Sequence, residues 1–470
     1  MIIHPNDNVE VLLESRGEVP AGHKITLNYI SKGENIMKYG FPIGHATRDI
    51  APGEWVHSHN METNLRGTLD YEYKPSNVEH TIPAIAQNAT FFGYLREDGR
   101  VGVRNELWII PTVGCVSDLA SEMAHRMQHE TSLTVRALTH TFGCSQLGDD
   151  HEHTRQLIAA LAGHPNAGGV LILGLGCENN QVSKLQPLIH SPRTRFLETQ
   201  KVEDELEEGL NILRDLANIA EKQIRTEQPI SKLCVGLKCG GSDGFSGITA
   251  NPLLGRFSDW IVKHGGTTIL TEVPEMFGAE TILMNRCKNR DVFDKTVSLI
   301  NNFKQYYLSH NLPVGENPSP GNKEGGITTL EEKSLGCIQK GGTSAVTGVL
   351  QYTENVSRSG LNLLCAPGND LVASTALAVS GCQIVLFTTG RGTPFGTCVP
   401  TIKVSTNTDL YKRKPHWIDF DAGRMLTNTT ADTLLQQLID LIIRIAEGEL
   451  SLNEKHNQSG IAIWKTGVTL

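Results

Sequence analysis

Two histidines spaced two residues apart are the first side chains along the chain that could do chemistry. His57 and His59 lie in the segment VHSHN (56–60). On a β-strand, which we predict here, residues at i and i+2 project from the same face. Two imidazoles on one face can chelate a divalent ion or place a base beside an anion, and Asn60 adds an amide able to bind a hydroxyl. A solvated strand face without a chemical role fits the pattern equally well.

Cysteines next to glycines form a second group. Cys115, Cys144, Cys177 and Cys239 each fall at the predicted carboxyl end of an apolar strand. In open α/β sheets, ligands bind beyond this end of the strands, so we expect the four thiols to meet on one rim. The competing interpretation is a small buried residue at a tight turn. Other polar residues expected near the rim are His140, Glu178, Asn180, Lys238 and Asp243.

Glycine-rich loops supply a third kind of candidate. GLGCENNQ (174–181) and LKCGGSDGFSG (237–247) resemble nests in which successive backbone N–H groups hold a carboxylate. FTTGRGTPFGT (387–397) adds Arg391, whose planar fork suits a carboxylate. Each loop taken alone is equally well a tight strand-to-helix turn. No P-loop and no GxGxxG with its expected acid occurs, so nucleotide binding is not supported.

The elements that must position these residues change character along the chain. Residues 1–65 show short strand patterns divided by Gly and Pro turns, which predict a small β-rich module, and residues 66–89 are predicted to be a linker. From residue 90 to residue 470, apolar runs of strand length alternate with helical patterns, which predicts mostly parallel, Rossmann-like sheets, divided into two subdomains near 230–330. The stretch SPGNKEGGITTLEEKSLG (319–336) is too long for a turn and is predicted to be a functional loop.

The composition narrows the function classes. The chain has 470 residues, a formal charge of −9 and 39% apolar residues, which is typical of a globular protein and disfavours binding to nucleic acid or to anionic membranes. No apolar run is long enough to cross a bilayer, and the start, MIIHPNDNVEVLL, lacks the features of a secretory signal. We therefore expect a cytoplasmic protein with ten reduced cysteines. Because GxSxG, HExxH and CxxC are absent, serine hydrolases, zincins and zinc ribbons are disfavoured.

Longer motifs resemble one known family over essentially the whole chain. KYGFPIGHATRDIAPGEWVHSHN (38–60) is similar to the N-terminal SAF-type β-clip module of sugar-acid dehydratases. The rest resembles the catalytic part of the altronate/galactarate dehydratases. The segments that carry this resemblance are GYLREDGRVGVRNELWIIPTVGC (93–115), HTFGCSQLGDDH (140–151), GLGCENNQV (174–182), GGSDGFSGITANPLLGRFSDW (240–260), LTEVPEMFGAE (270–280), SPGNKEGGITTLEEKSLG (319–336) and WIDFDAG (417–423).

The resemblance implies a fold, an activity and a cofactor. The fold is α/β, with a small β-clip module followed by a large body of mostly parallel, Rossmann-like sheets. The activity is a hydro-lyase reaction that removes water from D-altronate to give 2-dehydro-3-deoxy-D-gluconate, with galactarate dehydratases and two-subunit sulfolactate sulfo-lyases as relatives. The family also implies a divalent metal, iron(II) or in its place manganese(II).

The chemistry assigns roles to the candidate residues as hypotheses. Removing the C2 proton beside a carboxylate creates a second negative charge, so a cation must stabilise the enediolate, a base must take the proton and an acid must assist loss of the C3 hydroxyl. Catalytic candidates are His57, His59, His140 and Lys38. Metal ligands are expected among His57, His59, Cys144, Cys177 and Glu178, and substrate contacts among Asn60, Arg96, Arg104, Asn180 and Arg391.

Other functions compete with this one. Three of the four strand-end cysteines could instead hold an iron–sulfur cluster. Their spacing fits no ferredoxin-type run, and the resemblance implies a single metal ion rather than a cluster. A non-catalytic sugar-acid binding protein is a further alternative, which the density of His, Cys and Glu around the Gly turns disfavours. The expected partner is a small sugar acid, with neither nucleic acid nor membrane, and a homodimer would be unsurprising at this size.

Overall fold

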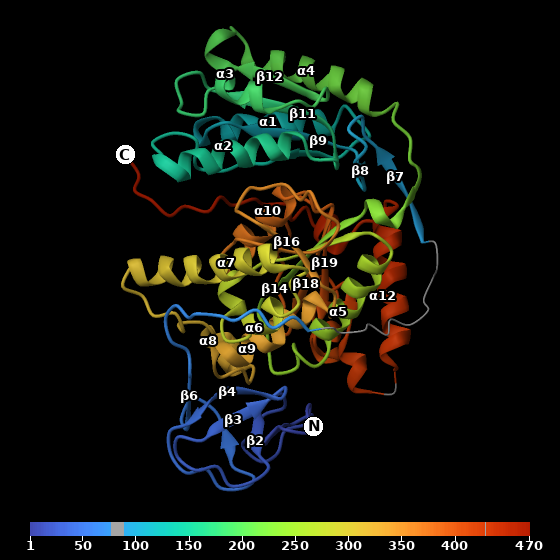
Figure 1. Ribbon diagram of the computed structural model, residues 1–470. Helices are drawn as coiled ribbons and strands as arrows, with labels where there is room; N and C mark the ends of the chain where they lie inside the picture. Colours follow the sequence, from blue (N-terminus) through green and yellow to red (C-terminus); the bar gives the residue numbers. More distant parts are fainter. Residues whose placement is uncertain (77–88, 428) are drawn as a thin grey trace.

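The chain forms three parts whose order in space differs from their order along the chain, as Figure 1 shows for the computed structural model. The structure describes residues 1–76, 89–427 and 429–470. The N-terminal module lies at one end, a large C-terminal region lies in the middle, and the second region lies at the far end. Part of the linker predicted for 66–89, residues 77–88, lies outside the described residues.

The N-terminal module consists of two small antiparallel sheets. One has the order β1-β2-β5 and the other the order β3-β4-β6. Apolar residues of both sheets, such as Ile36, Ile43 and Val56, are fully buried and belong to the same core as the C-terminal region. The strands are β1 (Val9–Val11), β2 (Lys24–Thr26), β3 (Asn35–Lys38), β4 (Phe41–Ala46), β5 (Trp55–Val56) and β6 (Met61–Glu62).

The second region is built on a four-stranded parallel sheet of order β10-β9-β11-β12. An antiparallel ribbon of order β13-β7-β8 joins it to the C-terminal region. Its strands are β7 (Thr90–Leu95), β8 (Val101–Gly102), β9 (Glu106–Pro111), β10 (Val135–Ala137), β11 (Ala167–Gly174), β12 (Thr194–Glu198) and β13 (Thr226–Pro229). Its helices are α1 (Ser117–Gln128), α2 (Gly148–Ala162), α3 (Val182–Leu185) and α4 (Glu205–Ala220).

The C-terminal region is built on a seven-stranded parallel sheet of order β16-β17-β15-β14-β18-β19-β20. Its strands are β14 (Cys234–Cys239), β15 (Thr267–Leu270), β16 (Val346–Leu350), β17 (Gly360–Leu364), β18 (Ile384–Thr389), β19 (Thr401–Ser405) and β20 (Phe420–Asp421). Its helices are α5 (Ala250–Lys263), α6 (Glu280–Met284), α7 (Arg290–Ser309), α8 (Pro320–Glu324), α9 (Leu330–Cys337), α10 (Asp370–Val379), α11 (Thr408–Arg413), α12 (Ala431–Ala446) and α13 (Leu452–Lys455).

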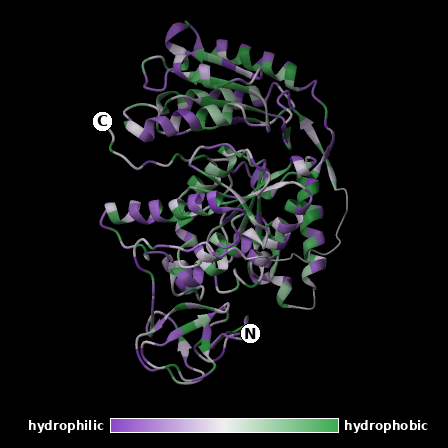
Figure 2. Ribbon diagram, in the orientation of Figure 1, coloured by the Kyte–Doolittle hydropathy of each residue, from purple (hydrophilic) through white to green (hydrophobic). Residues whose placement is uncertain are grey.

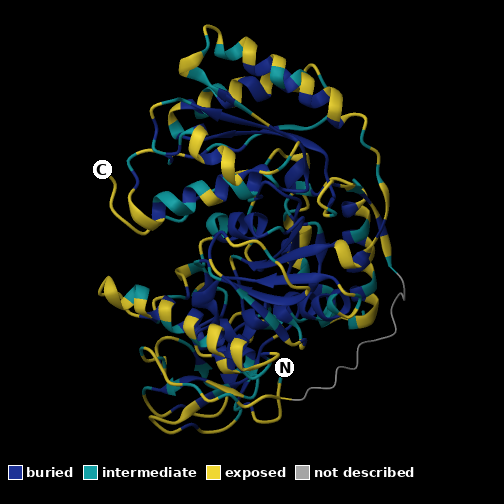
Figure 3. Cartoon of the chain, turned by 45° about the horizontal axis from the view of Figure 1, so that its top comes forward, coloured by how far each residue is buried: buried dark blue, intermediate teal, exposed yellow. Residues whose placement is uncertain are grey.

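Strands that are buried on both faces form the centre of the hydrophobic cores in the two parallel sheets. β11, β14 and β18 are buried along their whole length, because helices cover both sides of each parallel sheet. Apolar residues line the sheets and the inner faces of the helices (Figure 2), and exposed residues gather on the outer helix faces (Figure 3). Among the described residues, no helix is long and apolar enough to cross a membrane. The predicted α/β architecture with an N-terminal β-module is confirmed.

Three local predictions were wrong. β5 ends at Val56, because Asn60 bonds back to the backbone of His57 and makes a turn, so the two histidines do not share a strand face. Residues 319–336 form α8 and α9 rather than a loop, since Ser319 and Thr329 cap the two helices. The four thiols do not share one rim, because Cys239 ends a strand of the seven-stranded sheet and the other three belong to the four-stranded sheet.

Candidate functional site

Two lysines of the N-terminal module share one buried carboxylate of the C-terminal region. Lys24 Nζ donates to Glu332 Oε2 and Lys38 Nζ to Glu332 Oε1, both at 2.8 Å, and none of the three side chains is more than 2% exposed. Against the effect of burial, the two lysines lower the pKa of Glu332 to about 2. This ion triad holds the module against α9, and we call the contact region the junction.

The two lysines of the triad differ in how easily they lose a proton. Burial lowers the pKa of Lys24 to about 8, since it outweighs the attraction of Glu332. Burial also acts on Lys38, but there the attraction of Glu332 and Tyr39 prevails and the pKa is raised. Glu332 connects the two lysines, and the proton on Lys24 is held more weakly than the proton on Lys38.

A second layer of buried charge lies behind the triad, at the carboxyl ends of β14 and β15. Lys333 pairs with Glu275 at 2.8 Å, and Lys340 lies 2.8 Å from Cys239 Sγ and 3.3 Å from Glu272. The remaining members of the layer are Lys238, which bonds to Glu272 and to Asp370, and Cys337, whose Sγ lies 3.3 Å from Cys239 Sγ.

A small closed cavity separates the two layers. It holds about 10 Å³, which is the space of one water molecule. Lys38, Tyr39 and Lys333 lie on its wall together with Asp243. Tyr39 has a backbone φ of +60, a conformation that residues other than glycine rarely adopt. Burial raises the pKa of its phenol. Burial also raises the pKa of Asp243, whose oxygens accept bonds from Ser246, Thr406 and Asn407.

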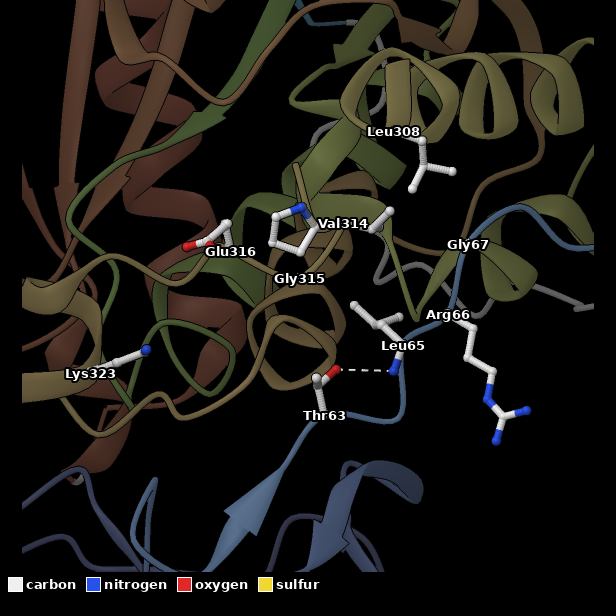
Figure 4. A pocket seen from close by; sticks show the side chains of 10 residues that line it. Thr63, Leu65, Arg66, Gly67, Leu308, Val314, Gly315, Glu316 and Lys323 are labelled. Carbon is white, nitrogen blue, oxygen red and sulfur yellow. Dashed lines mark hydrogen bonds between the residues drawn. The ribbon is translucent and has the colours of Figure 1, made fainter. Parts of the chain in front are cut away.

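A larger cleft opens at the outer edge of the junction. It holds about 330 Å³ and lies between the segment that leaves the module and the stretch from α7 to α8. Figure 4 shows Thr63, Leu65 and Arg66 on one side, Val314 and Glu316 across from them, and Lys323 at one end. This volume is large enough for a six-carbon acid, and Arg66 and Lys323 supply the cationic side chains.

Of the predicted site residues, four lie at the junction. Lys38 belongs to the triad. His57 is partly buried, its Nε2 lies 3.0 Å from the carbonyl oxygen of Lys323, and burial lowers its pKa to about 4. Asn60 is buried in the turn that orients His57, and Arg391 pairs with Glu324 of α8 at 2.8 Å. His59 is exposed on the module, with its ring 5.6 Å from that of Trp55.

Five others gather at the carboxyl edge of the four-stranded sheet. Cys144 and Cys177 are exposed. His140 is buried, both of its ring nitrogens meet backbone groups, and burial lowers its pKa to about 4. Glu178 accepts bonds from Thr112 and from backbone N–H groups of its own loop, and Asn180 is fully buried.

The two remaining arginines lie at neither place. Arg96 donates to the Pro165 and Arg104 carbonyl oxygens and to Asn105. Arg104 pairs with Glu454 at 2.6 Å and also donates to backbone oxygens at the end of α12. Both guanidinium groups connect chain segments, so the structure gives them a positioning role in the fold.

The metal that the resemblance implies does not fit the junction. Among the described residues, Cys239, Glu275 and Cys337 are the only set of three potential ligands whose donor atoms all lie within 4.8 Å of one another. Lys340 donates to Cys239 Sγ, and the ammonium group of Lys333 already neutralises Glu275. A divalent cation would therefore enter a region whose negative charge is already compensated.

Sequence reasoning missed most of the junction. Lys24, Glu332 and Lys333 were not singled out, and neither were Glu275 or Lys340. The one available signal was a lysine inside a short apolar strand, since a lysine that is fully buried needs a partner. The partner of Lys24 lies 308 residues away, so no local pattern could reveal it.

Comparisons with known proteins agree with the arrangement into three parts. Residues 10–64 match the altronate/galactarate dehydratase SAF domain, residues 93–221 match the second domain of the D-galactarate dehydratase/altronate hydrolase family, and residues 230–469 match the C-terminal domain of D-galactarate/altronate dehydratases. The chain belongs to this family. The resemblance seen in the sequence motifs is confirmed.

Relatives with assigned names cover nearly the whole chain. The altronate dehydratase of Bacillus subtilis (strain 168) is 55% identical, with 98% of this chain and 94% of that protein covered. The altronate dehydratase of Escherichia coli (strain K12) is 51% identical, with 99% and 94% covered. The galactarate dehydratase (L-threo-forming) of the same organism is 31% identical, with 95% and 92% covered.

Proposed function

We propose that this family member is a hydro-lyase that dehydrates D-altronate to 2-dehydro-3-deoxy-D-gluconate. The observation that carries the proposal is the identity of 55% and 51% to proteins named altronate dehydratase, against 31% to a galactarate dehydratase, over nearly full-length alignments. The proposed ligand is a small sugar acid, and the proposed place of action is the cytoplasm.

The junction offers the charge that the reaction requires. The cavity wall carries the ammonium groups of Lys38 and Lys333, so an enediolate formed there meets two cations in a region shielded from water. The cavity holds only about 10 Å³, so we propose that the sugar acid enters through the cleft beside Arg66 and Lys323 while the N-terminal module opens. The module then closes again on α9 before the proton is transferred, which restores the bonds of Lys24 and Lys38 to Glu332.

Lys38 is the proposed base for the C2 proton. Lys24, with a pKa of about 8, gives up its proton first. A proton that passes from Lys38 through Glu332 to Lys24 leaves a neutral amine on the cavity wall, where it can take the C2 proton. Because Glu332 and Tyr39 raise the pKa of Lys38, this transfer is uphill, and the neutral amine at Lys38 is a minor form from which the reaction proceeds. Lys24 is thus a positioning residue, since it acts on Lys38 through Glu332 and does not line the cavity.

The second half of the reaction requires a proton donor at the C3 hydroxyl. Tyr39 is proposed for this role, because its phenol lies on the same wall and its raised pKa keeps it protonated. The enol that remains after water leaves tautomerises to the 2-keto acid.

The experiment that tests the proposal follows 2-keto-acid formation under anaerobic conditions, with D-altronate and with galactarate as separate substrates. We expect turnover of D-altronate and at most slow turnover of galactarate. If galactarate alone is turned over, the substrate is galactarate and not D-altronate, while the proposed reaction type still holds. Absence of turnover with either acid, in a folded and metal-supplemented protein, would contradict the proposed function.

A further inference from the structure

The four-stranded sheet contains a switch point, where the chain changes the side on which it adds strands. β9 comes first, β10 is added on one side of it and β11 on the other, and all neighbours are parallel. Leu107 and Ile109 of β9 share a hydrophobic core with α1, whereas Trp108 and Ile110 face the core that contains Leu185 of α3. The loops after β9 and β11 therefore lead to helices on opposite faces, and open parallel sheets bind ligands at such a point.

Hydrogen bonds connect three loops at this edge of the sheet. Gly114 N donates to Phe142 O at 2.9 Å, which connects the loop after β9 with the loop after β10. Thr112 Oγ1 donates to Glu178, which connects the loop after β9 with the loop after β11. We call residues 112–116, 140–148 and 175–181 the switch-point loops.

Two buried amides of the switch-point loops have polar atoms without partners. Asn180 is 0% exposed and Gln146 is 2% exposed. Among the described residues, neither Nδ2 nor Oδ1 of Asn180 has a hydrogen-bond partner, and Nε2 of Gln146 has none either. Burial of such groups is costly unless a bound molecule satisfies them.

The two amides are neighbours, because both side chains or backbones bond to one residue. Gly143 N donates to Gln146 Oε1 at 3.0 Å, and Asn180 N donates to Gly143 O at 3.1 Å. Gly143 has φ +106, and a Cβ there would lie 2.0 Å from Thr112 O. Close packing of a backbone that only glycine adopts readily thus holds the two amides in place.

The free groups and the local charge indicate what kind of molecule fits. The amides offer N–H donors and one acceptor oxygen, and a hydroxyl both donates and accepts. Burial acts against ionisation of Glu178, but bonds from Thr112 and from backbone N–H groups lower its pKa, so it is an anion. No lysine or arginine of the described residues pairs with Glu178 in an ion pair. Uncharged hydroxyl groups therefore fit this place better than a carboxylate or a phosphate.

From these observations we infer that the switch-point loops bind a polyol, a chain of neighbouring hydroxyl groups. Asn180 donates to and accepts from these hydroxyls, and Gln146 Nε2 donates to them. The chain of hydroxyls belongs either to a neutral alditol or to a sugar acid. This site lies in the second region, at the far end of the molecule from the N-terminal module (Figure 1), so it is separate from the junction and does not rest on the proposed function.

Exposed thiols on the same loops report whether the site is occupied. Cys115, Cys144 and Cys177 are free and exposed, one on each loop. The test treats the full chain with iodoacetamide and measures the alkylation rate of each of these cysteines by peptide mass spectrometry. D-mannitol, D-gluconate and acetate are the three probes.

We expect a polyol to slow alkylation of at least one of the three thiols several-fold, while acetate leaves the rates unchanged. Equal protection by D-mannitol and D-gluconate identifies a neutral polyol as sufficient, and protection by D-gluconate alone identifies a sugar acid. Protection by acetate as strong as that by D-gluconate would indicate an anion site and overturn the inference. Unchanged rates with all three probes would overturn it as well.

Variants of buried amides separate binding from a structural role. Asn180→Leu keeps nearly the same shape without hydrogen-bonding groups, so protection should be lost while the unfolding midpoint without ligand stays the same or rises. Asn105→Leu is the comparison, because that buried amide bonds to Ala220 O at 2.8 Å and to Arg96 at 3.0 Å, and its midpoint should fall. Asn211→Ala removes an exposed amide on α4 and should keep both midpoint and protection.

Two results with these variants would contradict the inference. If Asn180→Leu lowers the midpoint of the ligand-free protein as much as Asn105→Leu does, the amide of Asn180 serves the fold and not a ligand. If folded Asn180→Leu is protected by the polyol as well as the wild type is, the polyol binds elsewhere.

Discussion

The carboxyl edges of the two parallel sheets are built from the same kind of strand ends, but reactive side chains are buried and paired at one edge and exposed at the other. At the seven-stranded sheet, lysines, glutamates and Cys239 are buried and paired, and the N-terminal module covers them. At the four-stranded sheet, three thiols are exposed and largely unpartnered. The first edge can place charges in a dry region where they interact strongly, and the second edge can bind a group that comes from outside.

Among the variants that test this comparison, Glu332→Gln is expected to have the largest effect. Glu332→Gln leaves Lys24 and Lys38 buried without their shared carboxylate, which should destabilise the junction by about 3–5 kcal/mol. We expect a lower unfolding midpoint, faster proteolysis of the segment 66–76 and loss of turnover.

The matched control for Glu332 is Glu324→Gln, because that carboxylate is 67% exposed and makes one surface pair with Arg391. Its effect on the unfolding midpoint should be small. A Glu332→Gln variant as stable and active as the control would show that the triad does not hold the junction together.

The next effect concerns the proposed base. Lys38→Met removes the amine from the cavity wall while keeping most of the side-chain volume, so kcat should fall about 10²–10⁴-fold with D-altronate. Lys295→Met, which removes an exposed lysine on α7, is the control and should keep wild-type turnover. If Lys38→Met keeps a near wild-type kcat, Lys38 is not the base and another group takes the C2 proton.

The pH profile gives a finer test of how the triad works. Activity should rise with pH and show an inflection near the pKa of Lys24, about 8, because the neutral amine is the active form. Lys24→Met removes a positive charge next to Lys38, so the pKa of Lys38 should rise and the inflection should move to higher pH. If the inflection stays at the same pH in Lys24→Met, Lys24 takes no part in the proton transfer.

The sequence predicted the strands better than the junction. β11, β14 and β18 are continuous apolar runs, and burial on both faces gives such runs an unambiguous local pattern. The ends of β9 and β11 lie within a few residues of the predicted positions, whereas β10 ends at Ala137, well before Cys144. The pattern could not show that Cys239 belongs to a second sheet, because strand order depends on contacts between distant segments.

The junction was missed for the same physical reason. Lys24 and Lys38 lie in short strands of the module, and their partner Glu332 lies 308 and 294 residues farther along. The acidic pair and lysine at 331–333 had the composition of a solvated loop, yet all three side chains are buried in α9. Charged residues at exposed and buried positions look alike in a single sequence, so only the packed structure separates them.

The smallest expected effects concern His57 and His59, and they separate a side chain that bonds across the junction from an exposed one. His57→Ala loses one hydrogen bond to the Lys323 carbonyl, which should cost about 1 kcal/mol of stability. His59 is exposed and should tolerate alanine with no measurable change in the unfolding midpoint. Because only His57 bonds across the junction, only His57→Ala should lower the unfolding midpoint. Thermal melts of the two variants check this difference, and an equal loss in both would contradict a role for His57 in holding the covered edge closed, since His59 contacts only Trp55 of its own module.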